Sequence, residues 1–336
     1  MSLSAVSVKK DNGLVWSAMV SNEIQSVERR LMELVFSKVP TVFKLSEHLL
    51  SAGGKRLRPA LVALSAKVTG KPYDTERITT VGAAAELIHM ATLVHDDVID
   101  QTNVRRGCAT ANSFWGNKVS VLSGDHMLSK AFWLLSCDGD VRILETISSM
   151  SIAMSESEVQ QAICEGNLER WKESYFDIVR GKTAGFFAAC CKSGAIIGGA
   201  SPAVQESLYD YGMQLGVAFQ ITDDILDIVG SPSMTGKPLG NDLREGKFTL
   251  PLLLMLDSVD GASRQSLFDI MGRPELSEED ILLISKTAQL SGAVGKASDI
   301  AASYASKATA ALANLPAGDI KGCLESLACN IIGRCS

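Results

Sequence analysis

VGAAAELIHMATLVHDDVIDQTNVRR, residues 81–106, is the stretch that decides the fold and the chemistry of this 336-residue chain. Its first half is small and apolar, and it ends in three carboxylates and a basic pair, Asp96, Asp97, Asp100, Arg105 and Arg106. Because no Pro or Gly interrupts residues 83–101, the pattern predicts one long helix from about residue 75 to 103. Asp96 and Asp100 then share a helix face, with Cβ atoms roughly 5–6 Å apart.

Like charges at this spacing repel unless a cation neutralises them. A solvated acidic helix end is one explanation, and a metal site is the other. The pattern recurs 127 residues later as Asp223, Asp224 and Asp227 in AFQITDDILDIVG, again within an apolar helical run. Mg²⁺ is usually bound by one or two carboxylates together with substrate phosphates. The two acidic motifs therefore predict two halves of one metal cage, and the neighbouring Lys and Arg residues indicate a phosphate-ester substrate.

Composition limits the class of protein. The hydrophobic content of 46% is enough for a large core, and no linker or shift in composition marks a boundary, so we expect one domain over residues 1–336. The net charge of −6 argues against a nucleic-acid partner. We expect no membrane span, because no uninterrupted apolar run reaches about 20 residues.

The eight cysteines form no C-x-x-C pair and no spaced set with His, which argues against a zinc site. They fit small hydrophobic residues in a reducing compartment. The N-terminus lacks the pattern of a secretory signal peptide. We therefore expect a cytoplasmic protein, or one in an organelle matrix if a transit peptide has been removed.

Helical periodicity extends over most of the chain, and no alternating run is long enough for a sheet. The expected helices cover residues 12–37, 41–50, 59–69, 118–136, 139–165, 168–191 and 202–229, and continue from 250 to the end with breaks near 261, 272–274 and 316–318. Residues 230–251 predict a polar loop, because Gly and Pro recur there; such long loops are often functional lids. The fold class is all-α, a large helical bundle with a central cavity.

Two basic stretches are candidate binding elements. In SAGGKRLRPAL, residues 51–61, three basic residues precede a helix that Pro59 is suited to begin, which predicts an anion site or else a charged loop. In RGKTAGFFAACC, Lys182 interrupts an apolar run. Its ammonium group either extends from the core to solvent or reaches into the site.

Six motifs together resemble the trans-isoprenyl diphosphate synthases. They are GGKRLRP, LIHMATLVHDDVID, RRG, GKTA, FQITDDILD and GKPLGNDLREGKFTLP, in this order over roughly residues 45–255. The spacing is most similar to the medium- and long-chain polyprenyl diphosphate synthases. The resemblance implies the isoprenoid synthase fold and head-to-tail condensation of isopentenyl diphosphate with an allylic diphosphate primer. Two departures are Ala109, where the family usually has Pro, and SESEVQQ at 155–161, which lacks a common Gly.

The resemblance also implies residue roles. Three Mg²⁺ ions per active site would be bound by Asp96, Asp100 and Asp223, supported by Asp97, Asp224 and Asp227. Isopentenyl diphosphate would be bound by Lys55, Arg58, His89 and Arg106. The allylic diphosphate would be bound by Arg105, Lys182, Thr183, Gln220 and Lys237, with Lys247 closing over it. The catalytic set is then Asp96, Asp97, Asp100, Asp223, Asp224 and Lys182.

The expected chemistry needs no nucleophilic side chain. Breaking an allylic C–O bond leaves a carbocation and a diphosphate, and metal ions and basic groups lower the barrier by neutralising the charge on the departing oxygen. His95 and His126 are therefore predicted to be structural. A terpene cyclase and a non-catalytic subunit of a heteromeric prenyl synthase remain alternatives. A homodimer through a helix such as 118–136 fits the family.

Product length depends on small residues below the first acidic motif. Ala91 lies five residues before Asp96, which on a helix is about 7.5 Å. With Ala91 and Thr92 at this level, the tunnel for the growing chain is predicted to be open. Its floor would be formed deeper by Ile88 or Leu87 with Phe132 or Trp133. The expected product is longer than C20, in the range C30 to C50. The alternative is that these small residues only allow close helix packing.

Overall fold

The computed structural model describes residues 15–105, 107–230, 239–273 and 275–333. Contacts divide the chain into two compact units: unit 1 comprises residues up to Leu144 with 193–200 and 316–323, and unit 2 comprises 145–192, 201–315 and the residues from Leu324 onward. This division falls within α7 (Val141–Cys164), α9 (Gly185–Ile197) and α17 (Asp319–Ile332). The single domain expected over the whole chain stays a prediction.

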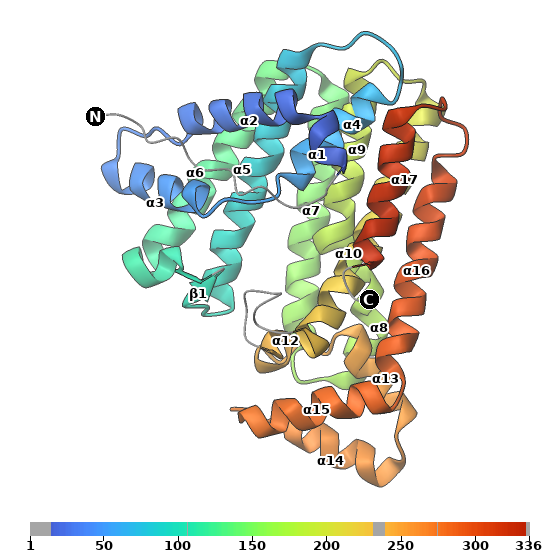
Figure 1. Ribbon diagram of the computed structural model, residues 1–336. Helices are drawn as coiled ribbons and strands as arrows, with labels where there is room; N and C mark the ends of the chain where they lie inside the picture. Colours follow the sequence, from blue (N-terminus) through green and yellow to red (C-terminus); the bar gives the residue numbers. More distant parts are fainter. Residues whose placement is uncertain (1–14, 106, 231–238, 274, 334–336) are drawn as a thin grey trace. The chain divides into compact units, whose positions relative to one another are not determined.

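Unit 1 is built around two long helices that pack against each other along their length (Figure 1). Its elements are α1 (Val15–Met19), α2 (Ser21–Leu34), α3 (Pro40–Ser51), α4 (Leu57–Lys67), α5 (Thr75–Ile99), β1 (Val104–Arg105), β2 (Cys108–Ala109) and α6 (Ala111–Asp138). The α5–α6 pair forms the centre, and α2 runs crosswise to it (Figure 1). Every residue from Pro59 to Ala66 of α4 is buried, as expected for a core helix that is apolar on all sides.

Helix α5 begins and ends at identifiable signals. The Asp74 carboxylate accepts a hydrogen bond from the backbone N–H of Glu76 at 2.9 Å and so caps the first turn. At the other end Gln101 has φ of +52°, in the left-handed region, and the backbone N–H of Thr102 bonds to the carbonyl of Asp97 at 2.9 Å. The helix therefore stops at Ile99, and the predicted end near residue 103 is wrong because this turn reverses the backbone.

A short two-stranded hairpin follows α5, although no alternating run in the sequence is long enough to predict a sheet. Val104 pairs with Ala109, and Arg105 pairs with Cys108, in antiparallel register. Gly107, with φ of +75°, lies in the turn. Helix α6 then contains a kink at Gly116, which divides a short first segment from a longer one that includes the predicted helix 118–136.

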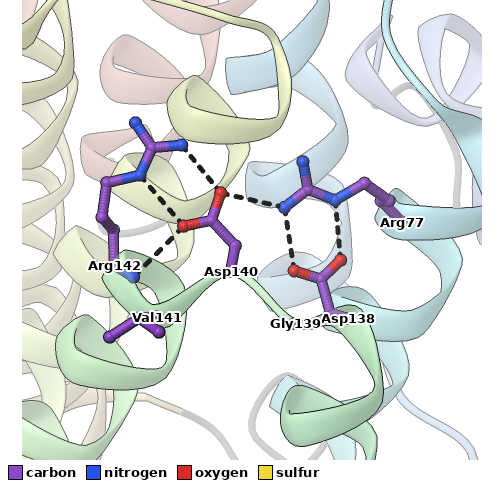
Figure 2. Close-up of a pocket in the computed structure, with 6 residues that line it drawn as sticks. All are labelled: Arg77, Asp138, Gly139, Asp140, Val141 and Arg142. Carbon is purple, nitrogen blue, oxygen red and sulfur yellow. Dashed lines mark hydrogen bonds and ion pairs between the residues drawn. The ribbon is translucent and has the colours of Figure 1, made fainter.

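An ion-pair cluster ties the start of α5 to the junction of α6 and α7 (Figure 2). The Arg77 guanidinium donates two hydrogen bonds of 2.8 Å to the two carboxylate oxygens of Asp138, whose side chain is fully buried. It also donates to Asp140 at 3.3 Å, and Arg142 donates to the same carboxylate at 2.7 and 3.0 Å. The bidentate geometry fixes the orientation of the side chains as well as neutralising their charges.

Unit 2 has a separate apolar core. Its further elements are α8 (Leu168–Val179), the π-helix η1 (Arg180–Ala184), α10 (Pro202–Val229), α12 (Asn241–Arg244), α13 (Leu250–Ser258), α14 (Gly261–Met271), α15 (Glu278–Leu290) and α16 (Ala293–Ala311). Helices α10 and α16 pack against each other, while α14 and α15 run crosswise to α16 (Figure 1). Buried Trp171, Phe248 and Leu252 belong to the core cluster of this unit.

Two segments of unit 2 differ from the sequence expectation. The predicted helix 168–191 is interrupted at RGKTA by the π-helix, whose wider turn inserts one residue into the helical ladder. The predicted loop 230–251 contains α12, although its Gly and Pro content argued against any helix. The second difference arises from hydrogen bonds between Asp227 of α10 and the first turn of α12.

The all-α prediction is confirmed, with one short hairpin as the exception among the described residues. By length and composition α5 is apolar enough to cross a membrane, but 78% of its most apolar window is buried inside the protein. The core helix of a soluble protein passes the same test, so the apolar character of α5 is weak evidence for a span.

Candidate functional site

The first acidic motif (Asp96, Asp97, Asp100) lies at the C-terminal end of α5, in unit 1. Asp97 is only 2% exposed, whereas Asp96 and Asp100 are half-buried. Arg105, from β1, donates from Nε to Oδ1 of Asp97 at 2.7 Å. The hairpin thus supplies the counter-ion of the buried carboxylate, and the predicted diphosphate ligand Arg105 is paired with the acidic motif in this structure.

The basic stretch before α4 separates into residues with different environments. Arg56 has φ of +50°, is 8% exposed and donates to Glu86 at 2.7 Å, with Glu28 at 3.6 Å. It is therefore part of the packing between α2, α4 and α5. Lys55 is exposed and Arg58 half-buried, so these two predicted ligands differ from Arg56 in being accessible to solvent.

The second acidic motif (Asp223, Asp224, Asp227) lies on α10, in unit 2. Asp223 is exposed, but Asp224 is 2% exposed. Asp224 accepts hydrogen bonds from the Tyr175 hydroxyl at 2.5 Å and from the Gln220 amide at 2.8 Å. Thr183 in turn donates to the Gln220 carbonyl oxygen at 2.8 Å. Three predicted site residues therefore form one hydrogen-bonded chain that links η1 to α10.

Burial raises the pKa of the Asp224 carboxyl group well above its usual value, and the negative charge of Asp242 acts in the same direction. Burial, followed by the charge of Asp224, likewise raises the pKa of the Tyr175 hydroxyl. A phenol that keeps its proton remains a donor. Tyr175 is thus held in the form that donates to Asp224.

Asp227 explains the short helix in the expected loop. Its two carboxylate oxygens accept hydrogen bonds from the backbone N–H groups of Asn241 and Asp242, at 3.0 and 3.1 Å. These are donors that the first turn of a helix leaves without intrahelical partners. Lys247, just beyond α12, is 8% exposed and pairs with Glu245 at 2.6 Å. The second acidic motif therefore also organises the segment that carries Lys247.

Lys182 lies in η1 and pairs with Glu158 of α7. The distance from Nζ to Oε1 is 2.5 Å, and the side chains are 25% and 23% exposed. The sequence left open whether Lys182 extends to solvent or reaches into the site; the structure shows it bound to a carboxylate within unit 2.

The predicted chain-length residues lie on α5 and α6, in unit 1. Ile88 is fully buried and Ala91 is 1% exposed, while Thr92 and Phe132 are half-buried. Trp133 is 58% exposed, which leaves Phe132 as the aromatic candidate for the floor.

The remaining predicted residues are three histidine and basic side chains, His89, Arg106 and Lys237, together with His95. His89 is half-buried on α5. Arg106 and Lys237 lie outside the described residues. His95, predicted to be structural, lies 3.2 Å from the carbonyl of Val121 on α6. In the part of the chain that the structure describes, no three His, Cys, Asp or Glu side chains form a ready-made metal site.

Sequence reasoning missed two residues, Tyr175 and Glu158. Tyr175 lies 49 residues before its partner Asp224, and Glu158 reaches Lys182 only because α7 packs against η1. Glu158 is one of two glutamates in SESEVQQ and is the half-buried one, which is a weak signal at best.

Comparisons with known proteins identify the family of this chain. The profile of the polyprenyl synthetase family matches residues 39–288. The chain is 38% identical over 235 residues to octaprenyl diphosphate synthase of Escherichia coli, covering 70% of this chain and 72% of that protein. It is 33% identical over 311 residues to heptaprenyl diphosphate synthase component 2 of Geobacillus stearothermophilus, covering 93% and 95%.

A solved structure agrees with these sequence matches. It is the polyprenyl synthase of Caulobacter crescentus, crystallised with calcium and isoprenyl diphosphate, with a TM-score of 0.92 and 38% identity. The alignment covers 98% of this chain and all of that one.

Proposed function

The chain belongs to the polyprenyl synthetase family and is a prenyltransferase that elongates all-trans polyprenyl chains, and we propose that it does so with Mg²⁺ to give products of C30 to C50. The observation that supports the proposal is the common burial pattern of the two acidic motifs. In each motif the second aspartate, Asp97 or Asp224, is buried and hydrogen-bonded, while its neighbours Asp96 and Asp223 are more accessible. This pattern fits a role for the accessible carboxylates Asp96 and Asp223 as metal ligands and for the buried carboxylates Asp97 and Asp224 as their supports.

The donor chemistry of these residues fits magnesium. Carboxylate oxygens are hard ligands, and Mg²⁺ commonly uses one or two of them together with water and substrate phosphates. A preformed cluster of three protein ligands is therefore not required. Asp96, Asp100 and Asp223 would bind the ions, which supply neutralising charge for the departing diphosphate.

The side chains of this chain would carry out two tasks in the reaction, and the released pyrophosphate a third. Lys182 and Thr183 would orient the allylic diphosphate, whose C–O bond breaks with both electrons passing to the diphosphate oxygen. Lys55 and Arg58 would hold isopentenyl diphosphate so that its double bond attacks the carbocation and forms the new C–C bond. The proton lost from the product would pass to the released pyrophosphate, so no side-chain base is needed.

The direct test is turnover by the purified chain alone. Labelled isopentenyl diphosphate and an allylic primer are supplied with MgCl₂, and the dephosphorylated products are separated by chromatography. We expect incorporation that is abolished by EDTA and restored by Mg²⁺. Release of diphosphate without incorporation of label would indicate a cyclase.

A second subunit is the specific alternative, because the Geobacillus relative is named as component 2 of its enzyme. A chain that turned over only with an added partner would support that assembly. We propose instead a homodimer through α6, where Val121, Leu122 and Trp133 are 37%, 58% and 58% exposed. Sedimentation of Leu122→Glu and Trp133→Glu tests this, with a monomer expected for each variant and a dimer for the unchanged chain.

A further inference from the structure

The ion pair between Lys182 and Glu158 has a consequence for how diphosphate leaves the enzyme. We propose that Glu158 is a positioning residue that holds the Lys182 ammonium group between turnovers and weakens the binding of pyrophosphate. The inference rests on the proposed role of Lys182 as a ligand of the allylic diphosphate. Glu158 itself is outside the residues assigned above to substrate or metal.

The geometry of the pair shows a strong and partly shielded interaction. Nζ of Lys182 lies 2.5 Å from Oε1 of Glu158, and about three-quarters of each side chain is buried. Charges in such surroundings are screened less by water and salt than those of a surface pair. Glu158 therefore sets the position of the ammonium group and neutralises its charge.

The pair forms because α7 and η1 approach closely at the residues just before it. A Cβ atom on Gly181 would overlap the hydroxyl of Ser157 and would lie 2.9 Å from the carbonyl oxygen of Ala153. Only a glycine allows this approach. Glu158 follows Ser157 and Lys182 follows Gly181, so the close contact brings the two charged residues together. The π-helical turn is typical of functional sites.

A counter-ion at this position opposes the binding of any diphosphate to Lys182. The incoming anion must replace the carboxylate as partner of the ammonium group, and it also meets the negative charge of Glu158. Each condensation releases one pyrophosphate, and a site with an uncompensated lysine would retain it. Because Glu158 returns to Lys182 when the anion leaves, the pair favours release and the next round of elongation.

The test uses two variants of Glu158, one that removes the negative charge and one that keeps the charge but shortens the side chain. Glu158→Gln keeps an amide oxygen that accepts from Lys182 but removes the charge, whereas Glu158→Asp keeps the charge on a shorter side chain. Pyrophosphate is titrated calorimetrically into the whole protein with MgCl₂, and kcat and KM for the primer are measured in parallel. The matched control is Glu156→Gln, an exposed glutamate on the same helix.

We expect Glu158→Gln to bind pyrophosphate about tenfold more tightly, equivalent to about 1.4 kcal/mol, with lower KM and lower kcat. Glu158→Asp and Glu156→Gln should remain within about twofold of the unchanged chain. If the substitution merely damaged the fold, pyrophosphate would bind more weakly. Tighter pyrophosphate binding therefore cannot result from a purely structural role of Glu158. Should Glu158→Gln fold poorly, Glu158→Ala removes the same charge and should tighten binding as well.

Lys182→Ala separates this inference from the proposed function. If Lys182→Ala weakens pyrophosphate binding while Glu158→Gln leaves it unchanged or weaker, the role of Glu158 is wrong and the diphosphate site stands. If Lys182→Ala binds pyrophosphate normally, Lys182 is not a diphosphate ligand, and both the assignment and the inference fail.

Discussion

The hydroxyl of Tyr175 donates a hydrogen bond to Oδ2 of Asp224 at 2.5 Å and joins α8 to the second acidic motif. Gln220 donates to the other oxygen of the same carboxylate. Asp224 is thus held by two neutral donors, whereas the equivalent Asp97 of the first motif is paired with the guanidinium group of Arg105. The two motifs share a sequence spacing but fix their buried carboxylate by different means.

Removing the Tyr175 hydroxyl tests this support. In Tyr175→Phe the buried carboxylate loses one donor, so we expect the free energy of unfolding to fall by about 1–3 kcal/mol. A small displacement of the neighbouring Asp223 should lower turnover by roughly 10- to 100-fold. Urea unfolding and initial rates measure the two effects. Tyr209→Phe, half-buried on the same helix as Asp224, is the control and should change neither. Normal turnover in Tyr175→Phe would show that the hydroxyl does not position the motif.

Replacing either of the neighbouring aspartates Asp223 and Asp224 should lower turnover, but only one replacement should lower stability. Asp223 is exposed, so Asp223→Ala should leave the free energy of unfolding within about 0.5 kcal/mol, yet lower turnover by roughly a thousandfold. Asp96→Ala should also lower turnover by orders of magnitude while keeping the fold. Asp224→Ala should lose stability as well as turnover, because it leaves the buried hydroxyl of Tyr175 and the half-buried amide of Gln220 without their acceptor. Near-normal turnover of Asp223→Ala at limiting Mg²⁺ would contradict its assignment to the metal.

Arg105 should affect stability as well as primer binding. Arg105→Ala leaves Asp97, which is 2% exposed, without its guanidinium partner. We expect a loss of about 3 kcal/mol, at the low end for a buried pair because Arg105 is 25% exposed. Arg105→Lys should recover only part of this, since lysine lacks the planar donor group. Urea unfolding of both variants, with Arg29→Ala as an exposed control, decides the matter; equal stability of all three variants would refute it.

The cluster around Asp140 predicts a dependence of stability on pH. Hydrogen bonds from Arg142 lower the pKa of Asp140 from 3.8 to about 2, and Arg77 contributes in the same direction. A carboxyl group whose pKa is lower in the folded state stabilises the fold above its unfolded pKa. This contribution, about 1–2 kcal/mol after allowance for solvent screening, should be lost as the pH falls from about 4 to 2.

The measurement is urea unfolding between pH 2 and pH 5. The unchanged chain should lose stability more steeply over this range than Asp140→Asn, which lacks the titrating group. Glu145→Gln, an exposed residue on the same helix as Arg142, should follow the unchanged chain. Identical slopes for Asp140→Asn and the unchanged chain would mean that the cluster contributes nothing through Asp140.

Local patterns predicted most of the fold. The apolar periodicity and the lack of Pro and Gly in residues 83–101 located α5, and the same periodicity located the longer segment of α6 as residues 118–136, because these signals act over a few residues. The DDxxD spacing likewise identified the acidic clusters on α5 and α10. These features depend on the helix itself and need no knowledge of its neighbours.

Features that depend on turn geometry or on partners outside the same helix could not be predicted from local patterns. The end of α5 is set by the turn at Gln101, and α12 exists because the carboxylate of Asp227 accepts from its first N–H groups. The pairing of Arg105 with Asp97 and of Lys182 with Glu158 follows from tertiary packing. Residue type indicated that these side chains bind anions, but it could not show which partner they have before a substrate arrives.

The last prediction concerns product length, which depends on Ala91. A chain that grows from the first acidic motif along α5 passes the level of Ala91 about 7.5 Å below Asp96. Ala91 is 1% exposed, so a larger side chain at this position must enter either a tunnel or packed protein. If the tunnel passes here, the ring of Ala91→Phe occupies it and stops the chain, while the first condensations continue at the usual rate. If the position is packed, the ring costs about 1–3 kcal/mol of stability and leaves the product unchanged.

Chromatography of the dephosphorylated products, together with urea unfolding, distinguishes these outcomes. We expect C30 to C50 from the unchanged chain and about C15 to C20 from Ala91→Phe, with similar stability. Ala91→Ser adds little volume and should keep the original length. A product of C15 or C20 from the unchanged chain, or an unaltered length together with lost stability in Ala91→Phe, would show that the growing chain does not pass Ala91.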